Sequence, residues 1–270
     1  MLLREWRGVR RLSQLDLALE AGVSARHLSC LETGKAQPSH EMVIRLADAL
    51  GMPLRERNAL LVAAGYAPRY RESTLATPEM SLVRRAIQCI LRQQEPFPAL
   101  VTNRHWDVVL TNRATMRLLA LLRPEGPLHT NVLRQIFDPR DMRPVIGNWE
   151  EVAGDAIRHL HAEVAATPSD AKARALLEEV LAYPDVPDRW RRREPGATPL
   201  PLMTTVFRKD ALELRFFSTL TTFATPRDVT LEELRIECLF AADEATAGVC
   251  RSLAARDPSD GTEGGGVMAG

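Results

Sequence analysis

The sequence predicts an α+β protein with two domains: an N-terminal all-α bundle of five helices, then an antiparallel sheet with a helical insertion. Three observations support this fold class. Over residues 2–66, apolar residues recur at helical spacing between capping signals. Alternating apolar residues predict strands near residues 99–110 and again over 201–240. A region of mostly helical periodicity separates these two groups of strands.

The block from Ser13 to Glu32 predicts two short helices that meet at a tight turn. Ala18 is small enough for close helix packing, and Gly22 can adopt a turn conformation that other residues enter at a steric cost. Ser13 and Ser24 stand where N-caps of the two helices are expected. This pattern is typical of a helix-turn-helix. We expect four apolar side chains to share its core: Leu15, Val23, Leu28 and Leu31.

Residues 2–66 as a whole resemble the Xre-type helix-turn-helix of phage repressors and bacterial regulators. The resemblance implies binding to double-stranded operator DNA, with the second helix of the motif in the major groove. It also implies that Arg7 pairs with Glu32. The five expected helices cover Leu2–Arg10, Ser13–Ala21, Ser24–Glu32, Ser39–Leu50 and Leu54–Ala64.

The second helix of the motif has a polar, cationic outward side between Leu28 and Leu31. A helical hairpin with a purely structural role is the alternative interpretation, but it gives no reason for this composition. Arg26 is the candidate for reading bases, because an Arg near the start of such a helix can pair with guanine. The candidate DNA-contacting residues are Gln14, Lys35, Gln37 and Ser39 along the backbone, Arg26, His27, Ser29 and Cys30 toward the bases, and Ser24 and Ala25 at the helix start.

Composition predicts a cytoplasmic protein without membrane attachment. No apolar run approaches the length of a membrane span, and the N-terminus is an Arg-rich amphipathic segment rather than a signal peptide. The four cysteines form no CxxC pair, which predicts reduced thiols and no metal or cofactor. The net charge is zero, but residues 1–72 carry eleven Lys or Arg against eight Asp or Glu. This small basic excess fits phosphate contact.

A stretch over residues 64–80 that mixes Gly, Pro, Ser and Thr indicates a domain boundary. We expect a DNA-binding domain over 1–70, a linker over 71–78 and a second domain over 79–252. The Gly-rich tail at 253–270 is too poor in apolar residues to be ordered.

The second domain is expected to begin with a helix and two strands and to end with three antiparallel strands and a helix. Leu234–Phe240 contains good helix formers, but its apolar residues occupy every second position, which favours a strand. The expected helices are 81–94, 112–122, 131–137, 148–165, 169–181 and one from Asp243, and the expected strands are 99–101, 106–110, 201–208, 211–224 and 234–240.

Residues 75–252 resemble the MmyB-like ligand-binding domain that follows an Xre-type helix-turn-helix in many bacterial regulators. The segments PALVTNRHWDVVLTN and IGNWEEVA and the closing strands carry the resemblance. It implies a PAS-like sheet and a pocket for a fatty-acid-like or other small apolar molecule. Apolar residues between such a sheet and its helices also fit a plain core role. The candidate ligand-binding residues are Trp106, Val108, Leu110, Leu118, Phe137, Trp149, Met203, Phe216 and Leu220.

Together these features predict a homodimeric, DNA-binding transcription regulator that senses a small apolar ligand. The alternative is a DNA-binding adaptor or antitoxin-like factor whose C-terminal domain binds a protein partner. A hydrolase is the third class: Ser81, His105 and Asp107 are the ingredients of a catalytic triad. No nucleophile elbow, phosphate loop or metal motif accompanies them, so we expect no enzymatic activity.

Overall fold

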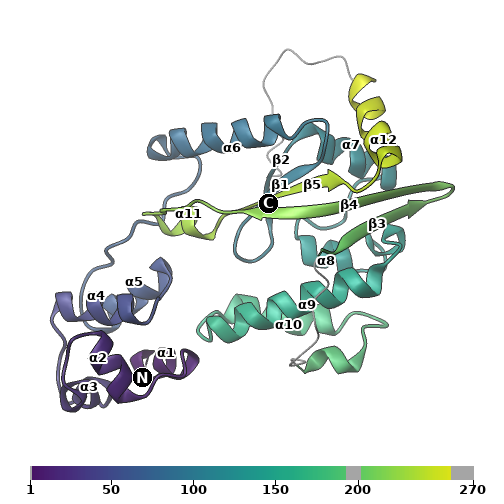
Figure 1. Ribbon diagram of the computed structural model, residues 1–270. Coiled ribbons are helices and arrows are strands. Elements are labelled where there is room, and N and C mark those ends of the chain that lie inside the picture. Colours follow the sequence, from purple (N-terminus) through teal and green to yellow (C-terminus); the bar gives the residue numbers. More distant parts are fainter. Residues whose placement is uncertain (1, 193–201, 257–270) are drawn as a thin grey trace. The chain divides into compact units, whose positions relative to one another are not determined.

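The computed structural model describes residues 2–192 and 202–256 (Figure 1). Most of the predicted disordered tail, residues 257–270, lies outside the described residues, as does the start of the strand expected from Pro201. The chain divides into two compact units. The first contains the residues up to Thr74 together with Phe223–Glu233, and the second contains Leu75–Thr222 and the residues from Leu234 onward.

The first unit contains the five helices that the sequence predicts, each within two residues of its expected ends. Serine side chains cap three of them, and Ser13 forms a full capping box with Asp16. Gly22 supplies the turn of the motif with φ +66°. The helices are α1 (Leu2–Val9), α2 (Gln14–Glu20), α3 (Ala25–Glu32), α4 (His40–Ala49) and α5 (Leu54–Ala63).

The core of this bundle differs from the expectation at one position. Leu28 is fully buried, as predicted, whereas Leu15 is 59 % exposed, so its assignment to the core is wrong. Leu17 is fully buried instead, because Leu17, Ala18 and Ala21 form the helical stripe of α2 that faces the core.

The second unit is built on an antiparallel sheet whose described strands have the order β2-β1-β5-β4-β3. Pairing of β1 with β5 joins the two groups of predicted strands into one sheet. This places β5 in the middle, with a partner on each side. The strands are β1 (Ala99–Thr102), β2 (Val108–Thr111), β3 (Thr204–Lys209), β4 (Leu212–Thr221) and β5 (Arg235–Ala241).

Helices lie on both sides of the sheet, with α6 along one side and α9 and α10 along the other (Figure 1). The helical insertion between β2 and β3 has its own core around Phe137, Leu160 and Trp190. The helices of the second unit are α6 (Ser81–Gln93), α7 (Arg113–Leu122), α8 (Val132–Phe137), α9 (Trp149–Ala166), α10 (Ala171–Leu181) and α12 (Glu244–Ala255).

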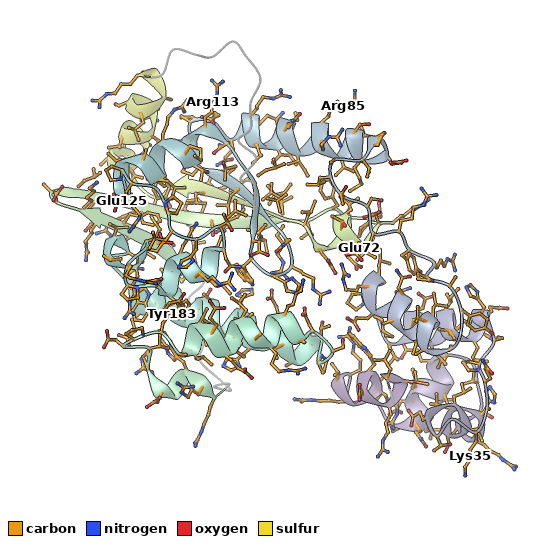
Figure 2. All side chains as sticks on the ribbon, turned by 180° about the vertical axis from the view of Figure 1, so that it is seen from behind. Lys35, Glu72, Arg85, Arg113, Glu125 and Tyr183 are labelled. Carbon is orange, nitrogen blue, oxygen red and sulfur yellow. The ribbon has the colours of Figure 1, made fainter. Side chains whose placement is uncertain are left out.

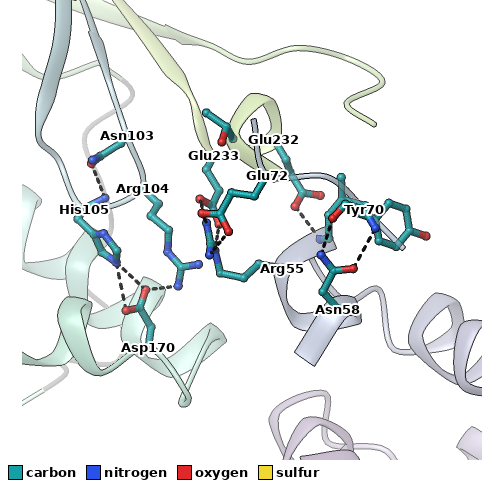
Figure 3. Close-up of polar contacts among 12 residues, drawn as sticks. Arg55, Asn58, Tyr70, Glu72, Asn103, Arg104, His105, Asp170, Glu232 and Glu233 are labelled. Carbon is teal, nitrogen blue, oxygen red and sulfur yellow. Dashed lines mark hydrogen bonds and ion pairs between the residues drawn. The ribbon is translucent and has the colours of Figure 1, made fainter. Parts of the chain in front are cut away.

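Asp170 joins the β1–β2 turn to the helical insertion (Figure 3). Its carboxylate caps α10, pairs with Arg104 and lies 3.1 Å from His105 Nε2. Burial opposes ionisation of this carboxyl, but hydrogen bonds from Ala173 N and from Arg104 and His105 lower its pKa to about 2. The partner of His105 is therefore a structural carboxylate on a helix cap.

Residues 223–233 connect β4 to β5, yet they cluster with the first unit. They carry α11 (Val229–Glu233), a helix that the sequence analysis did not anticipate. Asp228 accepts a hydrogen bond from Ser73 N at 3.1 Å and forms a parallel bridge with Arg71. The predicted boundaries place this segment in the second domain, over 79–252.

Candidate functional site

Helix α3 has one buried side and one polar side. Leu28 faces the core, and Arg26 is exposed and makes no ion pair within the described part of the chain. Lys35, just after the helix, is also exposed and projects from the surface of the bundle (Figure 2). An exposed, unpaired Arg near the start of this helix is the feature that reading a base edge requires. The short or polar neighbours Ala25, His27, Ser29 and Cys30 are half-buried.

Glu32 is the last residue of α3, and its carboxylate connects this helix to α1 and α2. Arg7 donates to its carboxylate through Nε at 2.6 Å and Nη2 at 3.0 Å, and Gln14 Nε2 donates at 2.7 Å. Burial opposes ionisation of Glu32, but these hydrogen bonds outweigh it and lower its pKa. The expected Arg7–Glu32 pair is thus present. Gln14 retains one amide N–H for a phosphate.

Three other candidate DNA-contacting residues already have partners within the bundle. Ser24 Oγ accepts from His27 N and Ser39 Oγ accepts from Met42 N, both at 3.2 Å. Gln37 Nε2 donates to the carbonyl oxygen of Ala64 at 3.2 Å. The two serine hydroxyls keep their own protons, which they can donate to phosphate oxygens. Contact of all these residues with DNA stays a prediction.

The second unit contains a cavity of about 450 Å³ between the sheet and helices α7, α8 and α9. This volume lies in the range of small-molecule sites, and the walls are mostly apolar. Leu220 lines it and is 57 % exposed, so the cavity reaches solvent near the end of β4. Six of the candidate ligand-binding residues line it: Trp106, Val108, Leu118, Met203, Phe216 and Leu220.

Leu110 does not line the cavity, although a regular strand would place it on the same face as Val108. The register of β1 and β2 shifts between Val101 and Thr102. This irregularity allows both Val108 and Thr111 to line the cavity, whereas Leu110 pairs with Val101, which does not line it.

Phe137 and Trp149 also lie away from the cavity, in the core of the helical insertion. Their rings meet edge to face at 6.1 Å between centroids. Trp149 Nε1 donates to the carbonyl oxygen of Ile136 at 2.7 Å, and the Arg143 guanidinium lies 3.7 Å from the centre of its ring. Unlike the expectation, these two residues do not line the cavity, because they pack against the helices of the insertion.

One end of the cavity is polar. Trp106, with φ +67°, donates from Nε1 to Glu163 Oε2 at 3.0 Å. Arg235 pairs with Glu163 and lies over the Trp106 ring, 5.6 Å from its centre. The charges of Arg235 and Glu163 thus balance one another at the cavity wall.

Glu237 faces the cavity from the middle strand of the sheet. Its neighbours across the strands are Leu100 on β1 and Leu220 on β4. Burial raises the pKa of Glu237, while a hydrogen bond from Ser218 opposes the shift. The carboxyl of Glu237 therefore lies between apolar side chains of the two neighbouring strands.

Comparison with known families decides what the two units are. The sequence model of the MmyB-like transcription regulator ligand binding domain matches residues 83–253, which is more than half of the chain. The chain belongs to this family. A helix-turn-helix domain model matches residues 1–60. The protein is thus a DNA-binding transcription regulator with a ligand-binding domain, in an α+β fold.

Other comparisons add little to this family assignment. A solved structure titled "Structure of an RNA-binding Light-Oxygen-Voltage Receptor" matches 93 % of this chain and 60 % of its own length, at 12 % identity and a TM-score of 0.27. A likeness at that score supports no argument about fold or function. No curated protein matches. Among the described residues, no helix is both long and apolar enough to cross a membrane.

The expectations for this MmyB-like regulator left out the polar residues of the cavity, among them Thr111, Glu163, Arg235 and Glu237. Alternation in β5 drew attention to its apolar side alone. A signal was available: a middle strand is covered on both faces, so a charged residue on either face of it is unusual. What the sequence did not show was that β5 is the middle strand, since this depends on pairing with β1, which lies more than 130 residues earlier.

Proposed function

We propose that this MmyB-like regulator binds a palindromic operator as a homodimer and changes its affinity when a small apolar molecule occupies the cavity. The observation that carries this proposal is the mainly apolar cavity of about 450 Å³ in a chain that also presents an unpaired Arg26 on a helix-turn-helix. The family resemblance suggests a fatty acid as the ligand. The protein acts by binding rather than by catalysis, and in the cytoplasm, where its operator is accessible.

In DNA binding, Arg26 contacts base edges and determines sequence specificity, whereas other residues contact the phosphate backbone of the DNA. Two recognition helices would lie about 34 Å apart on successive half-sites. Arg26→Ala should reduce discrimination between sequences by about 1–3 kcal/mol. Lys35→Ala and Gln14→Ala should weaken binding to all sequences alike, because phosphates carry no sequence information.

Fluorescence anisotropy with genomic fragments at moderate salt measures both effects. Arg85→Ala is the matched control, because Arg85 is an exposed arginine on α6 of the second unit (Figure 2). Equal losses of specificity in the Arg26, Lys35 and Gln14 variants would contradict the assignment of base contacts to Arg26 and phosphate contacts to the other two. A wild-type protein that does not discriminate between fragments would contradict operator binding itself.

On the ligand side, native mass spectrometry of the full chain tests the cavity. We expect a bound apolar molecule of low mass, which the cavity-filling variant Ala156→Phe should lose, since Ala156 lines the cavity. A stable heteromer with no small molecule in either protein would instead favour an adaptor that binds a protein partner.

The segment 223–233 offers a route from the ligand to the DNA-binding helices. Helix α5 begins after Pro53 and has no cap from its own side chains. Glu232 of α11 replaces that cap, accepting a hydrogen bond from Leu54 N at 2.7 Å. Arg55 then binds both Glu233 and Glu72 (Figure 3). Because this segment continues β4 and leads into β5, movement of either cavity-lining strand would act on α5.

Weakening this attachment should uncouple the two activities. We expect the double variant Arg55→Ala, Glu232→Gln to keep its affinity for the ligand and for the operator, but to lose most of the ligand-dependent change in operator affinity. Arg134→Ala is the control, because it removes an exposed ion pair with Glu179 within the second unit. An unchanged ligand response in the double variant would contradict this route.

A further inference from the structure

We propose that Glu237 recognises the head group of the ligand and selects an apolar molecule that carries a protonated amine rather than a carboxylate. This inference rests on the proposed function of the cavity as a ligand site and narrows the class of ligand. It keeps an apolar chain and replaces the acidic head that the family resemblance suggests.

The first argument is the charge that faces the cavity. Its lining contains Asp155, Glu163 and Glu237 as acids, Arg235 as the arginine, and His159, whose Nδ1 lies 3.9 Å from Asp155 Oδ2. Arg235 is neutralised by Glu163. A carboxylate ligand would therefore meet excess negative charge and no free guanidinium, whereas an ammonium group would find a partner.

Glu237 is the acid that best fits this role. Asp155 is already paired with Arg158 at 2.9 Å, and Glu163 is paired with Arg235. Glu237 makes no ion pair within the described residues. Its hydrogen bond comes from the neutral hydroxyl of Ser218, which leaves carboxylate lone pairs available on the cavity side.

The position of Glu237 strengthens an interaction with a cation. Leu100 and Leu220 are its direct neighbours on the two adjacent strands, and neither side chain offers a polar group that would compete for its carboxylate. Burial raises the pKa of its carboxyl, which means that the protein groups around it do not fully compensate the charged form. An ammonium group would supply that compensation with a charge-assisted hydrogen bond.

An independent observation is a second polar group in the cavity wall that has no partner of its own. Thr111 lines the cavity and is only 3 % exposed, yet its hydroxyl has no hydrogen-bond partner among the described residues. It lies on the opposite side of Leu100 from Glu237, about 10 Å away across two strand spacings. Buried hydroxyls are normally satisfied, so an unpaired one that faces a cavity indicates a missing polar partner.

Isothermal titration calorimetry with three probes of one chain length tests the proposal. Octylamine, octanol and octanoate are titrated into the full chain at pH 7. We expect octylamine to bind about tenfold or more tightly than octanol, and octanoate to bind most weakly. Glu237→Gln keeps the shape of the side chain and removes its charge. In that variant octylamine should lose its advantage, while octanol binding changes by less than about twofold.

Glu213→Gln is the matched control, because Glu213 is an exposed carboxylate on β4 that does not line the cavity. It should leave all three affinities unchanged. Octanoate binding more tightly than octylamine, or an amine preference that survives in Glu237→Gln, would overturn the proposal. Should Glu237→Gln not fold, the wild-type ratio of octylamine to octanol decides the question by itself.

The octanol titration tests the cavity as a ligand site independently of the role of Glu237. Octanol that binds to the wild type and not to Ala156→Phe supports the cavity as a ligand site, whatever Glu237 does. Octanol and octylamine of equal affinity would overturn the role of Glu237 and leave the cavity intact. Failure of all three probes to bind would overturn both.

Discussion

The candidate site of the first unit lies on its surface, whereas that of the second unit lies in its interior. In the first unit the core is filled, and Arg26 and Lys35 lie on the outside of the bundle. In the second unit the site is a hollow between the sheet and its helices, lined by residues that would otherwise be core. Arg26 and Lys35 can therefore be replaced without loss of core packing. In the second, the same side chains serve both stability and binding.

This difference shows how each unit can respond to a signal. A filled bundle of short helices moves as a body, because close packing resists gradual deformation. A sheet over a cavity can change its twist when the cavity fills, because side chains do not fill the space on that face. We infer that occupation of the cavity changes the shape of the second unit. The predictions below test this contrast, starting with the largest expected effect.

Removing Phe137 tests whether the helical insertion is filled core rather than cavity wall. Phe137 is fully buried between Trp149 and Trp190. Phe137→Ala should lower the free energy of unfolding of the second unit by about 3–5 kcal/mol, since it leaves a cavity in close packing. Urea denaturation followed by circular dichroism measures this, with Leu82→Ala as control, because Leu82 is exposed on α6 and does not line the cavity. A loss below about 1 kcal/mol would mean that the insertion is loosely packed.

Removing the charge of Glu32 tests how far the first unit depends on a single carboxylate. Glu32→Gln should destabilise the bundle by about 2 kcal/mol at pH 7, less than for a fully buried pair because Arg7 keeps contact with water. Hydrogen bonds lower the pKa of Glu32 in the folded state. The stabilisation is therefore present above its ordinary pKa and is lost as the pH falls through the lowered value.

Thermal unfolding of both proteins between pH 7 and pH 2 follows this effect. The wild-type and variant curves should converge as the pH falls, since the wild type loses the charge that the variant lacks. Parallel curves over that range would show that Glu32 acts through packing alone.

The same contrast explains what the sequence could and could not predict. The five helices of the first unit are neighbours in sequence, so capping serines and Gly22 fix them locally, and among them only the inward stripe of α2 was misjudged, at Leu15. Helix α11, which joins this unit from residues 223–233, was missed because its place depends on contacts distant in sequence. The strands of the second unit were also predicted from alternation. The cavity was predicted less well, because its polar residues depend on distant pairing and on the irregular register near Val101.

Removing the side chain of Asn148 tests the hydrogen bonds that attach the helical insertion to the edge strand β3. Asn148 Nδ2 donates to the carbonyl oxygen of Thr204 at 2.7 Å, and its Oδ1 accepts from Val206 N at 2.9 Å. Asn148→Ala leaves these backbone groups of β3 unpaired and should cost about 1–2 kcal/mol. Hydrogen exchange should show faster exchange of the Val206 amide. Unchanged exchange there would mean that other contacts hold β3.

The smallest expected effect is a gain in stability at the cavity floor. The Thr111 hydroxyl is buried and unpaired, so Thr111→Val, which keeps the shape of the side chain, should raise the free energy of unfolding by up to about 1 kcal/mol. Thr115→Val is the control, because the Thr115 hydroxyl donates to the carbonyl oxygen of Ala99 at 2.9 Å, and its loss should destabilise the protein. Opposite signs for the two variants in urea denaturation would show that the second unit gives up stability to keep a polar atom in its cavity. Destabilisation by Thr111→Val would instead mean that this hydroxyl already has a partner in solution, and the cavity would then resemble the filled bundle more closely than the structure indicates.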